Sequence, residues 1–273
     1  MNHGPSGRAG ALALRGGVTA WVTALVAVPV LVLAWRGIAD GPAAFWAAIS
    51  DPAAVDALWL SGWTAAVASV LNAIAGTALA WVLVRWDVPG RRAIGALVDL
   101  PLAIPTLVAG VLIIALFGPQ TPIGHWLVGI GIPVAFAKPG IVLALLFVTL
   151  PFGVRAVEPV LEELDPAEEE ASYTLGATPF YTLTRVLLPP LFPAIAAGAV
   201  QTFARSVAEF GSLAAVSGNI PHRTLVAPVY VLGEVEAGNP SGAAAVSLVL
   251  LAIALTLQPL GAALARRAGA RRA

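Results

Sequence analysis

The chain has 273 residues, of which 59% are hydrophobic and only 11% are charged, and its mean hydropathy is +0.88. Because soluble domains carry about 25% charged residues, this composition excludes an ordinary water-soluble domain and indicates a lipid bilayer as the surrounding solvent. A formal net charge of zero gives no sign of nucleic-acid binding, and the absence of cysteine excludes disulfides and thiolate metal sites.

Six apolar segments are long enough, or nearly so, to cross a membrane as helices of about 20 residues. Their apolar runs are continuous rather than alternating, which favours helices over barrel strands. In chain order the expected spans are residues 17–35, 57–84, 93–117, 140–154, 191–216 and 241–264. The fourth is short, and we expect it to begin near Val134. The sequence therefore predicts an all-α integral membrane protein with one transmembrane domain, residues 16–264, between tails at 1–15 and 265–273.

Basic residues lie mainly on one side of these spans. The side of the N-terminus holds eleven of the fifteen, namely Arg8, Arg15, Arg85, Arg91, Arg92, Arg155, Arg185, Arg266, Arg267, Arg271 and Arg272. The opposite side holds three, Arg36, Lys138 and Arg223, and the remaining one, Arg205, lies inside a span. Because cytoplasmic loops are enriched in Lys and Arg, we expect both termini to be cytoplasmic in a cell-membrane protein.

Small residues in the second span, Gly62, Gly76 and Ala80, are expected to pack against other helices. The third span contains Pro101 and Pro105, which should bend it and free backbone carbonyl groups, and Thr106 is placed to bond one of them. Such a bend either lines a translocation path or is an ordinary packed kink.

Asp99 lies near the inner end of the third span. We expect it to cap a helix or to pair with Arg91 or Arg92 rather than to bind a ligand.

A polar segment, LDPAEEEASYTLGATPFYTLTRVLLPP at residues 164–190, separates the fourth and fifth spans. Asp165 is a favourable N-cap, Pro166 suits the first helical position, and Glu168 stands where a capping-box glutamate would. Gly176 fits the left-handed residue that ends a helix. The first helix is therefore expected to be short, about ten residues, and too polar to cross the membrane.

A second short helix is expected to start at Thr178 and Pro179 and to stop at Pro189 and Pro190. The acidic residues of the first helix do not resemble a catalytic site, because no partner base, nucleophile or metal cluster accompanies them. Taken alone, they could simply cap helices in a solvated loop, and the whole segment has the form of a docking knob.

The pattern E-A-A-x3-G-x9-I-x-L-P marks the cytoplasmic loop of ABC importer permeases, and this segment resembles it with every spacing kept. Ser172 replaces the second alanine, and Val186 replaces isoleucine. The resemblance implies a coupling helix seated in a cleft of an ATP-hydrolysing subunit. Its matching positions are Glu170, Ala171, Ser172, Gly176, Val186, Leu188 and Pro189.

The resemblance covers residues 59–264, with the coupling loop at 156–190. The stretches LVDLPLAIPTLVAGV, PFGVRAVEPVLEELDPAEEEASYTLGA and FARSVAEFGSLAAVSGNIPHRTLVAP are similar to the T-type subunit of sulfate/thiosulfate permeases. Ala208 departs from the glycine expected before Glu209. The resemblance implies a type I ABC importer permease fold. It also implies a W-type permease as heterodimer partner, two ABC ATPase subunits and an extracytoplasmic sulfate-binding protein.

ATP chemistry is expected outside this chain. A P-loop needs Gly-Lys-Ser/Thr, and the only lysine is Lys138, in AFAKPG. We therefore expect a transport subunit that is not itself an enzyme, with no cofactor or metal of its own.

Four polar residues of the fifth span recur at helical spacing, namely Gln201, Arg205, Glu209 and Ser212. Charges at membrane depth usually face a bundle interior or an aqueous path, and a guanidinium suits an oxyanion. Arg205 could therefore attract sulfate in a translocation path. The alternative is that Arg205 and Glu209 neutralise each other and pin helices together.

The loop SGNIPHRT, residues 217–224, is polar and outside in this topology. Asn219, His222 and Arg223 could contact the binding protein or the arriving anion, or could simply be solvated.

Three other functions remain open. The first is an ABC permease for molybdate or tungstate, or, further off, phosphate. The second is a secondary transporter or channel, although that class is expected to show inverted repeats or coupling carboxylates within the spans. The third is an intramembrane enzyme, but the sequence contains no GxSxG or HExxH motif and no histidine cluster.

Overall fold

The computed structural model describes residues 5–270, and the side chains of residues 14–266; this part of the chain forms helices and connecting turns without a strand. The longer helices are α1 (Pro5–Ile38), α3 (Pro52–Arg85), α7 (Lys138–Glu163), α10 (Leu188–Val207) and α13 (Pro240–Ala270). The shorter ones are α2 (Pro42–Ile49), α4 (Arg91–Ala103), α5 (Thr106–Phe117), α6 (Pro122–Gly129), α8 (Pro166–Thr174), α9 (Pro179–Tyr181), η1 (Thr182–Leu187), α11 (Gly211–Val216) and α12 (Ala227–Glu236).

Five stretches are long and apolar enough to cross a membrane, and the bent pair α4–α5 would make a sixth. Within the described residues this agrees with the expected six spans if the bent pair counts as one of them. The fourth span, however, begins at Lys138 rather than near Val134, and it gains its length by continuing to Glu163.

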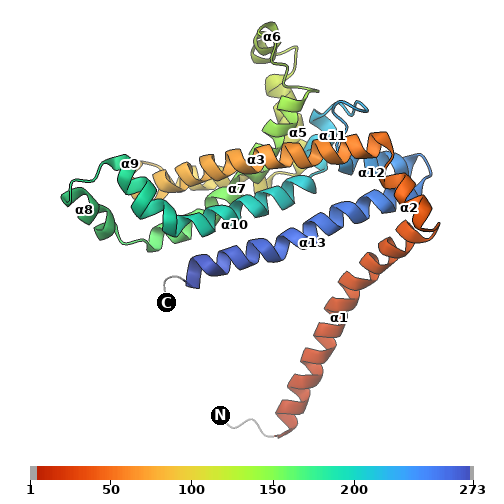
Figure 1. Cartoon of the computed structure of the whole chain (residues 1–273), viewed down its shortest axis with the longest axis horizontal. Coiled ribbons are helices and arrows are strands. Elements are labelled where there is room, and N and C mark those ends of the chain that lie inside the picture. The colour runs from red at the N-terminus through yellow and green to blue at the C-terminus, as the bar shows by residue number, and fades with distance from the viewer. Residues whose placement is uncertain (1–4, 271–273) are drawn as a thin grey trace.

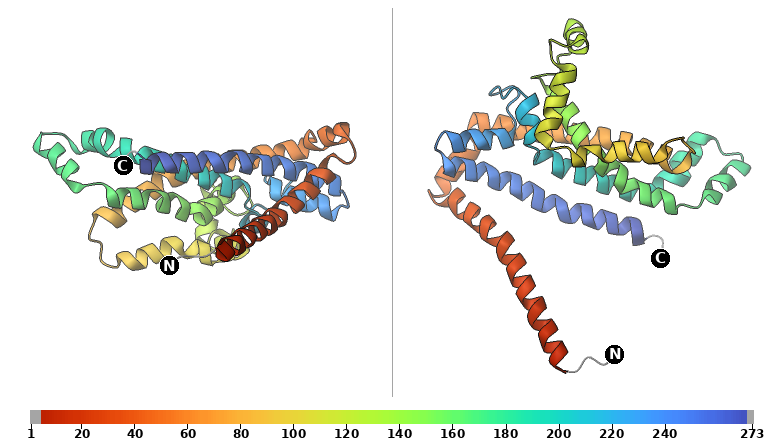
Figure 2. Two further views of the ribbon diagram at one scale, coloured as in Figure 1. Left: turned by 90° about the horizontal axis from the view of Figure 1, so that it is seen from below. Right: turned by 180° about the vertical axis from the view of Figure 1, so that it is seen from behind.

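Three long helices, α3, α7 and α10, form the packed centre of the protein, and α13 covers α10 (Figure 1). One buried cluster lies around Ile141 and Leu145 of α7, and a second lies around Val157 and Leu161 further along the same helix. Helix α1 touches α13 and α2 and then diverges from the other helices (Figure 2). Its large apolar side chains are exposed, as expected for a face that meets lipid or another subunit.

Helices α3 and α7 approach most closely where two glycines face each other. A Cβ on Gly76 would lie 2.8 Å from the backbone carbon of Gly153, and a Cβ on Gly153 would lie 2.7 Å from the carbonyl oxygen of Asn72. The amide of Asn72 donates to Thr149 Oγ1 across the same contact, at 2.8 Å. The expected packing role is therefore confirmed for Gly76, whereas a Cβ on Gly62 would meet nothing within 4 Å.

We expect Gly76→Ala to destabilise the protein by about 1–3 kcal/mol, because the added methyl group overlaps the backbone of α7. Gly62→Ala, in the same helix, should be neutral or stabilising by up to about 1 kcal/mol, since alanine favours the helix and has room. Thermal unfolding of the two purified variants in detergent measures the difference. Equal melting temperatures would contradict the close contact.

The third span is broken rather than gently bent. Helix α5 is bent by 111° from the direction of α4, and the break falls at Ile104 and Pro105, where the backbone is extended. A residue before proline is pushed out of the helical region, and Pro105 itself has no N–H to donate. Pro101, by contrast, is buried within α4 and does not end it.

Asp99 does not pair with Arg91 or Arg92. Its carboxylate accepts from Nε of Arg155, at 2.9 Å, and so joins α4 to α7. Arg91 instead contacts Glu162 in α7, at 3.3 Å. The expected partner was wrong because α7 continues beyond the predicted end of the fourth span and brings Arg155 beside α4.

Pro189 and Pro190 do not stop the second short helix, contrary to expectation. Residues 182–187 form a π-helix that leads directly into α10, and the Leu188 N–H donates to the carbonyl of Leu183. The wider i→i−5 turn lets the chain remain helical although the two prolines have no N–H. The resulting helical stretch, Pro179–Val207, is one of the five candidate spans.

Candidate functional site

Helices α8 and α9 lie together at one end of the molecule, beyond the ends of α3, α7 and α10 (Figure 1). Asp165 caps α8 by accepting from the Ala167 N–H, at 2.9 Å, and Pro166 occupies the first turn. Gly176 has φ +82°, the left-handed conformation that reverses the chain. Thr178 then caps α9 by accepting from the Tyr181 N–H, at 3.3 Å. These local predictions are confirmed.

Two contacts hold this segment to the rest of the protein. Arg85, the last residue of α3, places Nε 3.2 Å from Oε1 of Glu169, and both side chains are largely buried. The same guanidinium donates to the Leu164 carbonyl, at 3.0 Å. One turn further along α8, the hydroxyls of Ser172 and Thr182 lie 2.9 Å apart and are buried. Motion of α8 is therefore tied to α3 and to the start of α10.

The free side of the segment is hollowed and apolar. Ala171, Ser172, Gly176 and Val186 line one hollow of about 750 Å³. Leu175 and Tyr181 also line it and are 88% and 55% exposed, and the nearby Phe180 is 75% exposed. Large apolar side chains on an otherwise polar projection are typical of a docking surface.

Not all of the predicted coupling residues share that hollow. Glu170 is exposed but does not line it, and Leu188 and Pro189 belong to the first turn of α10. Sequence reasoning did not single out the exposed Leu175 and Phe180 or the contact of Glu169 with Arg85. Leu175 and Phe180 could have been found from the sequence, because they are large apolar residues close to Gly176 in a polar segment. The Arg85–Glu169 contact could not, because it joins residues that are distant in sequence.

Glu209 is the centre of a second polar site and is only 1% exposed. Its Oε2 lies 2.7 Å from Nη1 of Arg205, and its Oε1 accepts from both the N–H and the hydroxyl of Ser212, at 3.0 and 3.1 Å. The structure thus brings Arg205, Glu209 and Ser212 together. They do not lie along one continuous helix, because α10 ends at Val207 and α11 starts at Gly211.

The break in the third span packs directly against this site. A Cβ on Gly211 would lie 2.2 Å from Oγ1 of Thr106, and a Cβ on Gly110 would lie 2.5 Å from the Ser212 carbonyl oxygen. Thr106, which follows Pro105, therefore lies beside α11, whereas Pro101 lies in α4 on the other side of the break. Ala208 has φ −90°, so this position does not require the glycine that the resemblance suggested.

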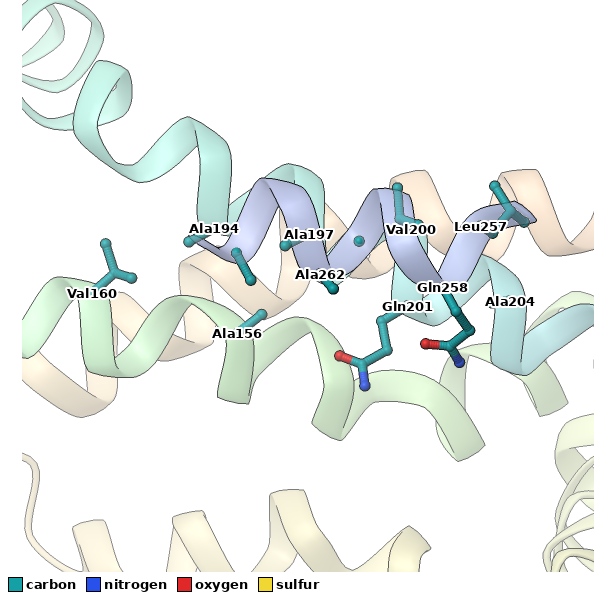
Figure 3. A pocket seen from close by; sticks show the side chains of 12 residues that line it. Ala156, Val160, Ala194, Ala197, Val200, Gln201, Ala204, Leu257, Gln258 and Ala262 are labelled. Carbon is teal, nitrogen blue, oxygen red and sulfur yellow. The ribbon is translucent and has the colours of Figure 1, made fainter. Parts of the chain in front are cut away.

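Gln201 lies apart from Glu209, in a pocket of about 280 Å³ between α7, α10 and α13. Most of the lining consists of small apolar side chains such as Ala197 and Ala262, and the amide of Gln258 is the other polar group (Figure 3). Both glutamines point to the same side of the pocket in that view. Gln258 was not identified from the sequence, although a polar residue within an apolar span was a visible signal.

The predicted outer loop residues make different contacts. His222 places Nδ1 2.7 Å from Oδ2 of Asp56, and Asn219, at φ +54°, donates its amide to the Ala214 carbonyl. Arg223 lines a small pocket of about 90 Å³ that His222 and Lys138 also line. Asn219 therefore shapes the turn, while His222, Arg223 and Lys138 line one pocket together with the acidic Asp56.

Few of the remaining ionisable groups of the described residues could act in catalysis or metal binding. Partial burial and the nearby carboxylates of Glu234 and Asp51 raise the pKa of Tyr230 to about 12, so its hydroxyl stays protonated at physiological pH. Within the described residues, no group of three His, Asp or Glu side chains could hold a metal ion.

Comparisons with known proteins agree with this arrangement. Residues 72–269 match the family described as "Binding-protein-dependent transport system inner membrane component". The chain is 40% identical over 260 residues to the probable sulfate transport system permease protein cysT of Nephroselmis olivacea, with 92% of each sequence covered. It is also 40% identical over 215 residues to the sulfate transport system permease protein CysT of Escherichia coli (strain K12), covering 79% of this chain and 78% of that relative.

A solved structure has the same fold. A chain from the crystal structure of a bacterial alginate ABC transporter, in complex with an alginate pentasaccharide-bound periplasmic protein, superposes with a TM-score of 0.75. The match covers 94% of this chain and 93% of that one, at 18% identity. At this identity the likeness concerns the fold alone.

Proposed function

The chain belongs to the family of binding-protein-dependent transport system inner membrane components, and from this premise we propose that it is the T-type permease subunit of an ATP-driven importer of sulfate and thiosulfate. The observation that carries the substrate is the 40% identity to a sulfate permease over 92% of both sequences. The five long apolar helices and the broken pair α4–α5 agree with a multi-pass membrane protein of the type I permease fold.

The importer would need partner subunits for ATP hydrolysis, for the other half of the pore and for delivery of the anion. We propose that two ABC ATPase subunits bind and hydrolyse ATP, and that one of them receives α8 and the apolar side chains beside it. A related W-type permease would complete the pore, and an extracytoplasmic sulfate-binding protein would deliver the anion to the surface formed by His222, Arg223 and the turn at Asn219. The docked α8 would then pass ATP-driven motion to α3 and α10 through the contacts of Arg85 and Ser172.

The arrangement of basic residues supports a cytoplasmic position for α8. Arg85 contacts α8 itself, and Arg185 lies in the adjoining η1. The C-terminal end of α13 lies at the same end of the molecule (Figure 1). Since Lys and Arg are enriched on the cytoplasmic side, the proposal places both termini and α8 in the cytoplasm.

Inside the membrane, the candidates for the anion's path are Arg205, Gln201 and the broken third span. Arg205 is 35% exposed while its partner Glu209 is fully buried, so part of the guanidinium is open to an approaching oxyanion. The break at Pro105 and Thr106 lies next to this pair and could shift with it as access alternates between the two sides of the membrane.

Uptake of labelled sulfate tests the function. The complex of this chain with the proposed W-type permease, ATPase subunits and binding protein is reconstituted in vesicles. We expect uptake that depends on ATP and on the binding protein, that thiosulfate inhibits, and that equimolar molybdate leaves largely unchanged. Uptake without ATP would favour a channel or secondary transporter, and displacement of sulfate by equimolar molybdate would favour the molybdate permeases.

A further inference from the structure

The guanidinium of Arg155 joins α7 to α4 at two points. Its Nε lies 2.9 Å from Oδ1 of Asp99 and its Nη2 lies 2.5 Å from Oδ2, which makes a two-pronged contact. Nη2 also donates to the Gly95 carbonyl one turn earlier in α4, at 3.1 Å. Nη1 contacts Glu158 in α7, so the guanidinium is oriented by its own helix as well.

The Arg155–Asp99 contact is important for α4, because few buried side chains attach this helix to its neighbours. Only Val98 and Pro101 of α4 are buried. The helix packs mainly along α7 and touches α3 only lightly. At its other end the chain bends by 111° at Pro105, beyond which α5 packs mainly against α11 and more lightly against α7. Helix α4 is therefore attached to α7 by a polar clamp and is separated from α5 by a joint.

The other end of α7 leads to the docking segment. Helix α7 continues from Arg155 to Glu163, about 12 Å at 1.5 Å per residue, and Leu164 and Asp165 then lead into α8. Arg85 holds this junction through Leu164 and Glu169. A displacement of α8 is therefore carried along α7 to the residue that grips α4.

We propose that Arg155 and Asp99 are positioning residues that make α4 move with α7 and α8 as one body, pivoting at Pro105 against α5. The inference rests on the proposed docking of α8 to an ATPase. The broken third span would then have a mechanical role, because α4 moves with α7 and α8 while α5 stays beside the buried Glu209.

Spin-label distances in the reconstituted complex test the pivot directly. The chain has no cysteine, so introduced pairs are labelled selectively. Leu97 of α4, Leu112 of α5 and Thr174 at the end of α8 are exposed. Between the nucleotide-free and ATP-trapped states, we expect the distance between Leu97→Cys and Thr174→Cys to stay the same and that between Leu97→Cys and Leu112→Cys to change. The reverse pattern would overturn the proposal.

Variants test the clamp itself. Asp99→Asn keeps the shape but removes the charge, and Arg155→Lys keeps the charge but removes the fork. We expect each to lower sulfate imported per ATP hydrolysed by about tenfold and to make the Leu97–Thr174 distance change on ATP binding. Glu162→Gln is the matched control, because the exposed Arg91–Glu162 contact joins the same two helices at a single point, and it should leave both readouts unchanged.

Unchanged coupling and an unchanged distance in both clamp variants would overturn the role of Arg155 and Asp99. If a variant does not assemble, the wild-type distances still decide whether α4 moves with α8. A wild-type complex that moves on ATP binding but imports no sulfate would contradict the proposed function alone.

Discussion

Leu175→Asp is expected to abolish ATP-driven import while leaving the permease folded. Leu175 is 88% exposed and follows α8 directly, so the isolated protein gains almost nothing from its side chain. A leucine buried in a partner contributes about 1.5–3 kcal/mol, and a carboxylate in the same place would be desolvated without a cation. A loss of about 3 kcal/mol corresponds to roughly 100-fold weaker binding. Binding of the purified ATPase to the reconstituted permease measures it.

Two neighbouring changes separate the apolar anchor from charge and from shape. Thr174→Asp adds the same charge to the same turn and removes only one methyl group, so ATPase binding should stay within about threefold. Leu175→Met conserves volume and should bind almost as the parent does. If Leu175→Asp bound the ATPase as tightly as the parent chain, the proposed docking surface would be wrong.

Much of this docking segment could be predicted because its signals are local. Asp165, Pro166, Gly176 and Thr178 each act through the backbone of the next few residues, so their spacing is enough to place two short helices and the turn between them. The contact of Arg85 with Glu169 joins residues on two different helices and could not be found in this way. A single sequence gives spacing along one helix but not which helices lie side by side.

The errors have a common physical origin. The prolines predicted only a bend in the span at 93–117, and a continuous apolar run predicted one helix at 191–216. The structure instead breaks the first completely at Pro105 and ends the second at Val207. At each break tertiary contacts compensate for the lost helical bonds, since α5 packs on α11 through Gly110 and Gly211. Pro189 and Pro190 gave the opposite error: they predicted the end of a helix, but a π-turn keeps the helix intact. Hydropathy records only whether a segment is apolar, so it detects neither effect.

The polar contacts at Glu209, Arg155 and Arg85 indicate that different parts of the molecule differ in mobility. Glu209 is fully bonded and buried between α10, α11 and α5, so that region is expected to be rigid. The clamp at Arg155 is partly exposed, and both this clamp and the more buried Arg85 contact join one helix to another through a single guanidinium. Motion that starts at α8 should therefore be taken up at the joint between α4 and α5, which lies beside the candidate path.

Arg205→Ala is expected to stop sulfate uptake, but this result alone would not reveal why. The change leaves the Glu209 carboxylate buried with only Ser212 as a donor, and removing one partner of a buried ion pair costs roughly 3–5 kcal/mol. Because Arg205 is 35% exposed, we expect the lower end of that range. Thermal unfolding in detergent should show this loss, and uptake would fall for a structural reason as well as any direct one.

The double variant Arg205→Met/Glu209→Gln separates the two roles. It removes both charges together, keeps both side chains near their original volume, and leaves an amide oxygen to accept from Ser212. Neutralising both partners of a buried pair is often close to neutral for stability, so we expect most of the lost melting temperature to return. If the guanidinium contacts the anion, uptake should remain at least about tenfold below that of the parent chain, the loss that follows from about 1.4 kcal/mol of missing interaction. Arg205→Lys/Glu209→Asp, which keeps a charge pair, serves as the control for assembly. Recovery of uptake together with stability in the double variant would show that Arg205 and Glu209 only pin the helices together, and the anion's path would then have to be sought at Gln201 and Gln258.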